Sequence, residues 1–240
     1  MIALIRIPAI FVYFLFVNIC LITVCILRPF HRDNVLVGGK LYGSISRLLG
    51  LRIIVRGQEN LPETSGVIIC NHQNSYDLIT VSGAVPNGTV TIGKKSLIWI
   101  PVFGWVYWVS GNILINRKNA SKASDTIKAT VSKIKKRRLR IWLFPEGTRS
   151  YGRGLLPFKL GAFRIARSAN EPVITFCASE LHNKIKLNRW NNGVLIIEIG
   201  KPEVVDDSKS LKEWSEHFRS GMQQRIAELN EEVAQLEKAQ

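Results

Sequence analysis

The chain has 240 residues, 46% of them hydrophobic, and a formal net charge of +15. This length predicts one compact domain with an appendage, and the hydrophobic content is enough to fill a core, which argues against a disordered or low-complexity chain. The positive charge favours an anionic partner, namely nucleic acid, a membrane surface or a phosphorylated substrate. The four cysteines lack metal or redox spacing, so we expect reduced thiols packed as small hydrophobic side chains.

An almost wholly apolar segment covers residues 7–27. As a helix it would be about 30 Å long, which is enough to cross a bilayer and too long for a signal-peptide core. More basic residues follow it than precede it, which favours a cytoplasmic side for the rest of the chain. A second helical stretch, residues 34–49, carries three glycines that would allow close packing on the first helix. Residues 1–50 are therefore predicted to be a helical membrane anchor that either spans the bilayer or dips into one leaflet.

Strand-like and helix-like segments alternate from residue 51 to residue 240. Apolar, β-branched runs predict strands at residues 51–56, 66–70, 89–92, 111–117, 139–144 and 194–199. Apolar spacing and a capping box at Ser210 predict helices at residues 77–84, 121–138 and 211–236. This alternation predicts an α/β domain with a central, mostly parallel sheet flanked by helices, ending in an amphipathic helix.

Three of the six tryptophans lie between Trp99 and Trp108. A membrane interface, an apolar ligand channel and ordinary core packing are all compatible with this cluster, and the choice stays open. Downstream, residues 121–167 carry 13 Lys and Arg against 2 Asp and Glu. Residues 135–138, at the end of the predicted helix 121–138, are expected to form a solvated face that touches anionic lipid.

One polar segment, residues 71–77, follows a buried strand and contains His72 and Asp77. Residues five apart lie roughly 140° apart on a regular helix, so these two cannot pair along one. They can pair if His72 lies on the turn before the helix and Asp77 in its first turn. The carboxylate would then hold one imidazole nitrogen and leave the other to take a proton. The alternative is that Asn, Ser and Asp only cap a helix and His72 is incidental.

A second polar segment, residues 144–150, also follows a predicted strand and is rich in glycine. Arg149 can hold a phosphate through two parallel hydrogen bonds, helped by backbone N–H groups near Gly147. Glu146 could accept a hydrogen bond from a substrate hydroxyl. The strand-like run before Arg117 likewise ends in an arginine.

Together these segments resemble the bacterial 1-acyl-sn-glycerol-3-phosphate acyltransferases. The family's N-H-x-x-x-x-D block matches residues 71–77, its glycine-to-arginine block matches residues 111–117, and its F-P-E-G-T-R block matches residues 144–149. The fourth block keeps Pro172 but has Phe176 near its expected second proline, a departure at the wall of the acyl pocket. The resemblance covers nearly the whole chain.

This resemblance implies acyl transfer from acyl-ACP or acyl-CoA to the sn-2 hydroxyl of lysophosphatidic acid, giving phosphatidic acid. We assign His72 as general base and Asp77 as the residue that orients it. The expected acceptor-binding residues are Glu146, Gly147, Thr148, Arg149 and Arg117. We expect no cofactor, no metal and no serine acyl-enzyme, because no metal cluster or G-x-S-x-G motif occurs.

The expected location is the bacterial inner membrane, with the catalytic domain facing the cytoplasm. Two alternatives stay open. One is an acyltransferase for another acceptor, such as glycerol 3-phosphate or a different lysophospholipid. The other is a basic, membrane-bound module without catalysis, although no nucleic-acid partner is expected because groove-reading and single-strand-binding patterns are missing from the sequence.

Overall fold

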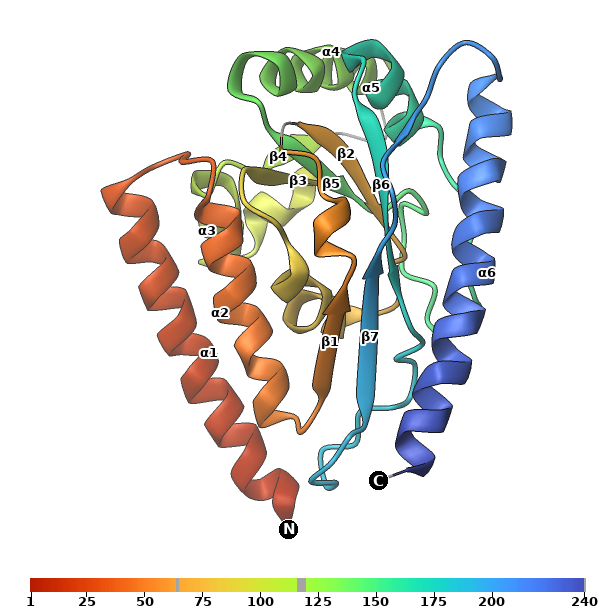
Figure 1. Cartoon of the computed structure of the whole chain (residues 1–240). Coiled ribbons are helices and arrows are strands. Elements are labelled where there is room, and N and C mark those ends of the chain that lie inside the picture. The colour runs from red at the N-terminus through yellow and green to blue at the C-terminus, as the bar shows by residue number, and fades with distance from the viewer. Residues whose placement is uncertain (64, 116–119, 240) are drawn as a thin grey trace.

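The computed structural model describes residues 1–63, 65–115 and 120–239 and contains a central eight-stranded sheet (Figure 1). The strands are β1 (Arg52–Arg56), β2 (Gly66–Cys70), β3 (Thr89–Lys94), β4 (Ile113–Ile115), β5 (Arg140–Leu143), β6 (Pro172–Ala178), β7 (Val194–Ile199) and β8 (Glu203–Val204). Their order is β1-β7-β6-β2-β5-β3-β4, with β8 beside β6. Only the β6 pairings with β7 and β8 are antiparallel within the described chain. The predicted mostly parallel sheet is therefore confirmed.

The α-helices are α1 (Ile2–Leu27), α2 (Asn34–Leu48), α3 (Phe103–Val109), α4 (Ala120–Arg137), α5 (Gly161–Ala169) and α6 (Leu211–Lys238). Short 3₁₀ helices are η1 (Gln58–Asn60), η2 (Ser75–Ile79), η3 (Val81–Ala84) and η4 (Lys95–Trp99). The capping box predicted at Ser210 is present at the start of α6.

Helices cover both faces of the sheet. Side chains of α4, α5 and α6 pack on the face that carries Val67, Ile69 and Ile141. The other face, with Ile68 and Trp142, packs against η3 and part of α2. Figure 1 shows α6 along one face, and α2 on the other with α1 outside it. Strand residues alternate between the two cores because successive side chains point to opposite faces.

The N-terminal helix α1 is apolar and only partly covered by protein. A narrow stripe, including Val17, Leu21 and Cys25, packs on α2 and α3. Most of the other large apolar side chains of α1 are exposed, among them Phe11, which is 61% exposed. Length and composition make α1 a candidate membrane helix, and it is an apolar helix suited to anchoring the chain.

The predicted helix over residues 77–84 is wrong in form, because η2 and η3 are two tight turns broken at Thr80. The glycines of α2 explain where these turns lie. A Cβ on Gly39 would fall 2.3 Å from the Ser82 carbonyl oxygen, and a Cβ on Gly43 2.8 Å from the Gly83 Cα. Gly39 and Gly43 therefore let α2 approach η3. The sequence predicted that all three glycines of α2 pack on α1, but only Gly38 faces that helix.

The predicted cysteine chemistry agrees with the fold. All four cysteines are free thiols, and three of them are buried, Cys25, Cys70 and Cys177. Burial raises the pKa of the Cys177 thiol to about 12, so this side chain stays protonated at neutral pH.

Candidate active site

His72 and Asp77 lie together after the carboxyl end of β2, where α/β folds place their sites. His72 Nδ1 is 2.6 Å from Asp77 Oδ2. His72 precedes η2 and Asp77 lies in its first turn, so the predicted pairing is confirmed. Because an ionised carboxylate only accepts hydrogen bonds, Nδ1 carries the proton and Nε2 holds the free electron pair. This tautomer is the one that can take a proton from a substrate hydroxyl.

Asp77 is fixed more firmly than a helix cap requires. Its side chain is 3% exposed, whereas that of His72 is 20% exposed. Oδ2 also accepts from the backbone N–H groups of Gln73 at 2.8 Å and Asn74 at 3.3 Å. The His72 ring stacks on Phe144 with centroids 4.0 Å apart and planes 14° apart. The imidazole is therefore held by a carboxylate at its edge and by an aromatic ring on its face.

Two amide side chains join the His72 loop to the end of β6, through contacts that no pattern in the sequence predicted. The Asn71 side chain donates to the Ala178 carbonyl and accepts from the Ala178 N–H, both at 2.9 Å. The Gln73 side chain donates to the Ser179 carbonyl at 2.7 Å and accepts from the Leu181 N–H at 2.6 Å. The last paired residues of β2 and β6 are Cys70 and Phe176, and beyond them these two side chains take the place of backbone hydrogen bonds between the strands. Their partners lie more than 100 residues away, which is why local spacing could not find them.

Glu146 is bound by two backbone N–H groups. It is 3% exposed, and its two oxygens accept from the backbone N–H of His72 at 2.6 Å and of Leu156 at 3.0 Å. Burial raises the pKa of Glu146 above its ordinary value, although both N–H groups and the nearby His72 lower it. The carboxylate therefore joins the His72 loop to the segment after the second motif, and both oxygens already have donors.

The second motif lies directly beside the His72 loop. The N–H of Ser150 donates to the His72 carbonyl at 2.8 Å, and that of Tyr151 donates to the Gln73 carbonyl at 2.9 Å. Gly147 adopts a φ of +72°, which lets the chain turn sharply after the buried Pro145 and Glu146. The two motifs therefore meet at one edge of the sheet, each just after one of the paired strands β2 and β5.

Thr148 and Arg149 are exposed at the tip of this turn. Arg149 Nη1 donates to the Tyr151 hydroxyl at 3.2 Å, and this bond is the main cause that lowers the Tyr151 pKa. The arrangement leaves a guanidinium on the solvent side of a loop whose other side touches His72. A cation in that place suits an anionic group on a substrate.

Lys159 is a cation near the site that sequence reasoning missed. Its backbone N–H donates to the Pro145 carbonyl at 2.8 Å, and its ammonium lies 2.9 Å from where a Cβ on Gly147 would stand. The spacing from Arg149 carries no motif, so only the folded loop shows the proximity. Arg117, the remaining predicted residue, lies outside the described residues.

The tryptophan cluster is on the surface. Trp99, Trp105 and Trp108 are 83%, 71% and 49% exposed, so core packing is wrong for these three. Trp105 and Trp108 line a groove of about 640 Å³, together with Lys95, Ile98, Val109, Leu114 and Thr126. An open, mainly apolar groove of this size fits a lipid chain or a membrane interface.

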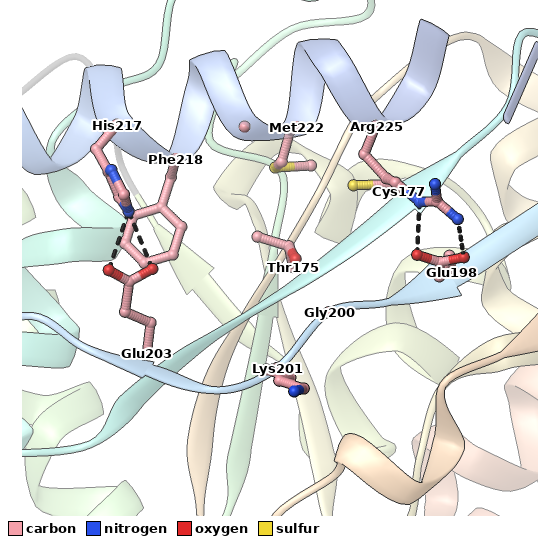
Figure 2. Close-up of a pocket in the computed structure, with 11 residues that line it drawn as sticks. Thr175, Cys177, Glu198, Gly200, Lys201, Glu203, His217, Phe218, Met222 and Arg225 are labelled. Atoms are coloured by element: carbon pink, nitrogen blue, oxygen red, sulfur yellow. Dashed lines mark hydrogen bonds and ion pairs between the residues drawn. The ribbon is translucent and has the colours of Figure 1, made fainter. Parts of the chain in front are cut away.

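A second cavity, of about 190 Å³, lies under α6 (Figure 2). His217 pairs there with Glu203 at 2.9 Å, and Arg225 donates through Nε to Glu198 at 2.6 Å. Figure 2 shows these pairs joining α6 to β7 and the segment that follows it, on either side of Met222. Its lining contains no residue of the two motifs. The cavity therefore belongs to the docking of α6, and His217 has a partner that the sequence did not predict.

The chain has clear relatives. Residues 52–179, which contain both motifs, match the Acyltransferase family. The sequence is 47% identical over 216 residues to the 1-acyl-sn-glycerol-3-phosphate acyltransferase of Salmonella typhimurium, covering 89% of this chain and 88% of the relative. It is 47% identical over 218 residues to the Escherichia coli protein of the same name, covering 90% of this chain and 89% of that protein.

A solved structure shares this fold. The crystal structure of the 1-acyl-sn-glycerophosphate (LPA) acyltransferase from Thermotoga maritima aligns with a TM-score of 0.73 at 24% identity, covering 95% of this chain and 97% of that chain. Its agreement bears on the fold alone, whereas the sequence relatives bear on the family. The chain therefore belongs to the acyltransferase family, among the bacterial 1-acyl-sn-glycerol-3-phosphate acyltransferases.

Proposed function

We propose that the chain transfers an acyl group from a thioester to the sn-2 hydroxyl of 1-acyl-sn-glycerol 3-phosphate and so makes phosphatidic acid. The observation that carries this proposal is the 2.6 Å contact between His72 Nδ1 and Asp77 Oδ2 beside the Arg149 loop. The relatives named above carry the same activity in their names. The donor is acyl-ACP or acyl-CoA, since both present the same thioester carbonyl.

His72 acts as the general base. Its Nε2 takes the proton of the sn-2 hydroxyl while the oxygen attacks the thioester carbonyl carbon. The carbon–sulfur bond breaks, and the proton passes from His72 to the leaving thiolate. A positioned base typically contributes about 10²–10⁴-fold to the rate. Asp77 stabilises the imidazolium that forms and keeps the ring in the required tautomer.

Cations on the second loop hold the acceptor. Arg149, on this loop, and Lys159, whose ammonium lies near Gly147, would bind the phosphate of the acceptor together with N–H groups of the loop, with Arg117 and Thr148 as further predicted contacts. Glu146 serves instead as a positioning residue, since its oxygens hold the backbone of His72 and Leu156. This replaces the contact with a substrate hydroxyl that the sequence suggested for Glu146.

The N-terminal helix supports a location of the site at a membrane. The start of α1 and the segment just after it both touch the α/β part of the chain: Ala3 N–H donates to Asn188 at 2.9 Å, and Phe30 N–H, three residues after α1, donates to the Val109 carbonyl at 2.8 Å. A helix crossing about 30 Å of hydrocarbon would need its ends on opposite sides of the bilayer. Because the same basic domain contacts both ends, we propose that α1 lies within one leaflet, along the membrane surface.

We further propose the cytoplasmic leaflet of the bacterial inner membrane as the location. The basic residues Arg28, Arg32, Arg137 and Arg138 gather where α1 ends, since Arg137 donates to the Phe30 carbonyl at 2.8 Å and Arg32 to that of Arg138 at 3.3 Å. Basic clusters of this kind favour the anionic cytoplasmic surface. The division into an anchor at 1–50 and an acyltransferase domain at 51–240 is part of this proposal.

The test is to identify the product. Detergent-solubilised wild-type protein is given an acyl thioester with lysophosphatidic acid, glycerol 3-phosphate or lysophosphatidylcholine, and products are resolved by mass spectrometry. The proposal predicts phosphatidic acid from lysophosphatidic acid at the highest kcat/KM. Faster acylation of another acceptor would show that this acceptor, and not lysophosphatidic acid, is the preferred substrate. Absence of any acylated product would contradict the assignment as an acyltransferase.

A further inference from the structure

The loop of residues 186–190, between β6 and β7, is fixed to the first turns of α1. Arg6 is 6% exposed, and its guanidinium donates to the carbonyls of Leu187 at 3.0 Å, Arg189 at 2.5 Å and Trp190 at 3.3 Å. The Asn188 side chain accepts from the N–H of Ala3 and from the amino terminus at 3.4 Å. The loop therefore has a defined position beside the start of α1, although the two segments are more than 180 residues apart.

This loop presents an exposed aromatic ring among cations. The Trp190 side chain is 71% exposed, and the Arg6 guanidinium lies 5.6 Å from its ring centroid. Lys186 and Arg189 are exposed on the same loop, and residues 181–192 contain no Asp or Glu. Tryptophan prefers the boundary between hydrocarbon and headgroups, and Lys and Arg favour anionic headgroups.

The same chemistry occurs at the opposite end of α1. There, Phe30 meets Trp108 edge-to-face with centroids 5.0 Å apart, next to the cluster of Arg28, Arg32, Arg137 and Arg138. Between the two ends runs the exposed apolar surface of α1, which includes Leu4, Ile5, Phe11, Phe16 and Ile19. An aromatic and basic group thus stands at each end of one exposed apolar helix.

We infer that the 186–190 loop is a second membrane contact, in which Trp190 lies at headgroup level and Lys186 and Arg189 bind the phosphates of anionic phospholipids. This inference rests on the proposed placement of α1 in one leaflet. A contact at each end of α1 fixes the rotation of the domain on the membrane. A contact only at the end where Phe30 meets Trp108 of α3 would leave this rotation free. The occupant is the bilayer itself, because the loop continues the exposed apolar surface of α1.

Quenching by brominated lipid tests the position of Trp190. The full chain is reconstituted into phosphatidylethanolamine–phosphatidylglycerol vesicles with or without a phosphatidylcholine brominated near the headgroup. The emission of Trp190 is obtained as the difference in fluorescence between wild type and Trp190→Phe. The emissions of Trp105 and of the buried Trp214 are obtained in the same way from Trp105→Phe and Trp214→Phe. We expect the Trp190 component to be quenched as strongly as the Trp105 component, and the Trp214 component to keep its intensity.

The reverse pattern would overturn the inference. If Trp190 emission survives in brominated vesicles and is quenched by aqueous iodide, the loop faces water. If neither Trp190 nor Trp105 is quenched, both the membrane contact of the 186–190 loop and the proposed membrane placement of α1 are wrong. Phosphatidic acid formation in the same vesicles reports the proposed reaction separately, because none of the three tryptophans belongs to the catalytic loops.

A charge variant tests the headgroup contact. Lys186→Gln with Arg189→Gln should lower the quenching of the Trp190 component at least twofold and leave that of Trp105 unchanged. Lys212→Gln with Arg164→Gln, at an exposed lysine on α6 and an exposed arginine on α5, is the matched control and should change neither. Equal quenching of Trp190 with and without the two cations would contradict headgroup binding.

Discussion

The chemistry proposed at His72 depends on a small set of hydrogen bonds whose donors and acceptors are all identified. Asp77 fixes Nδ1, Glu146 holds the backbone N–H of His72, and Ser150 holds its carbonyl. The ring, the amide and the carbonyl of one residue are thus each bound by a different partner. Such preorganisation reduces the motion that the base needs before it can take a proton.

Glu146 gives a prediction that separates positioning from substrate binding. Glu146→Gln keeps one acceptor oxygen but turns the other into an amide nitrogen, which cannot accept from Leu156 or His72. We expect kcat to fall roughly 10- to 100-fold, the loss of one hydrogen bond to a charged group. The KM for lysophosphatidic acid should stay within twofold.

Steady-state kinetics with varied acceptor measure both constants, with Glu59→Gln, an exposed carboxylate in η1, as the control. An increased acceptor KM at unchanged kcat would return Glu146 to the substrate-binding set. An unchanged melting temperature would show that the loss in kcat is not a loss of fold.

The cations at the second loop predict phosphate selectivity. Arg149→Ala and Lys159→Ala each remove a positive charge from the proposed phosphate site. The KM for lysophosphatidic acid should rise by at least tenfold, as expected for a charge-assisted hydrogen bond. Activity toward monoacylglycerol, which lacks the phosphate, should change little.

The readout is the ratio of kcat/KM for the two acceptors, and Arg164→Gln on α5 is a control of the same charge change. If both acceptors lose activity equally, Arg149 and Lys159 act on the loop and not on the phosphate.

At the scale of elements, α2 determines where the turn carrying Asp77 can lie. Gly39 and Gly43 bring the α2 backbone against η3, which directly follows η2. Sequence patterning predicted six of the eight strands and α2 within a few residues, because those patterns are local, but it predicted neither β6 nor β8. It missed the two 3₁₀ turns, because they depend on the approach of another helix and not on their own spacing.

A methyl group tests this packing. Gly39→Ala places a Cβ 2.3 Å from the Ser82 carbonyl oxygen, so α2 and η3 must separate. We expect the free energy of unfolding to fall by about 1–3 kcal/mol, the usual cost of overpacking, and kcat to fall with it. Gly221→Ala in α6, where a Cβ meets no atom within 4 Å, is the control and should stabilise by about 0.5–1 kcal/mol. Equal stability of Gly39→Ala and wild type in thermal unfolding would refute the packing argument.

The docking of α6 predicts a pH dependence of stability. Arg56 forms a bidentate ion pair with Glu232, and this hydrogen bonding lowers the Glu232 pKa below 4.5 despite the opposing effect of burial. A depressed carboxyl pKa in the folded state adds stability that is present above the unfolded pKa and is lost as the pH falls through the folded pKa.

Stability from this pair should therefore be constant at neutral pH and decline below pH 4.5. Glu232→Gln should cost up to about 1 kcal/mol at pH 7 and less at acid pH, because the pair is partly exposed. Unfolding free energies across pH measure the effect, with Glu231→Gln as the exposed control. A loss that is the same at all pH values would exclude the ion pair as its cause.

At the scale of the whole molecule, distant segments complete the site. Glu146 lies 74 residues from His72, and Leu181 lies 108 residues from Gln73, yet both pairs are hydrogen-bonded. The sequence indicated both motifs and their position just after strands, and the pairing of β2 with β5 then brings them together. It could not indicate the partners of the Asn71 and Gln73 side chains, which the strand order β6-β2-β5 brings near, nor the position of Lys159, which depends on how the loop after β5 folds back to Pro145 and Gly147.

The same arrangement relates the site to the membrane. α1 lies along the domain with both ends in contact with it, and its exposed surface is apolar along its length. An acceptor with one acyl chain in the leaflet would present its phosphate and hydroxyl to the domain on the membrane surface. The basic charge concentrated in residues 121–167 suits both the anionic acceptor and the anionic surface.

The most direct test of the account is the turnover of labelled lysophosphatidic acid with an acyl thioester by wild type and by His72→Ala. We predict that phosphatidic acid formation falls by about 10²–10⁴-fold in the variant. The variant should keep its melting temperature and its KM for the acceptor, and His31→Ala, an exposed histidine outside the site, should keep full activity. Near-wild-type turnover in His72→Ala would contradict the assignment of His72 as the base.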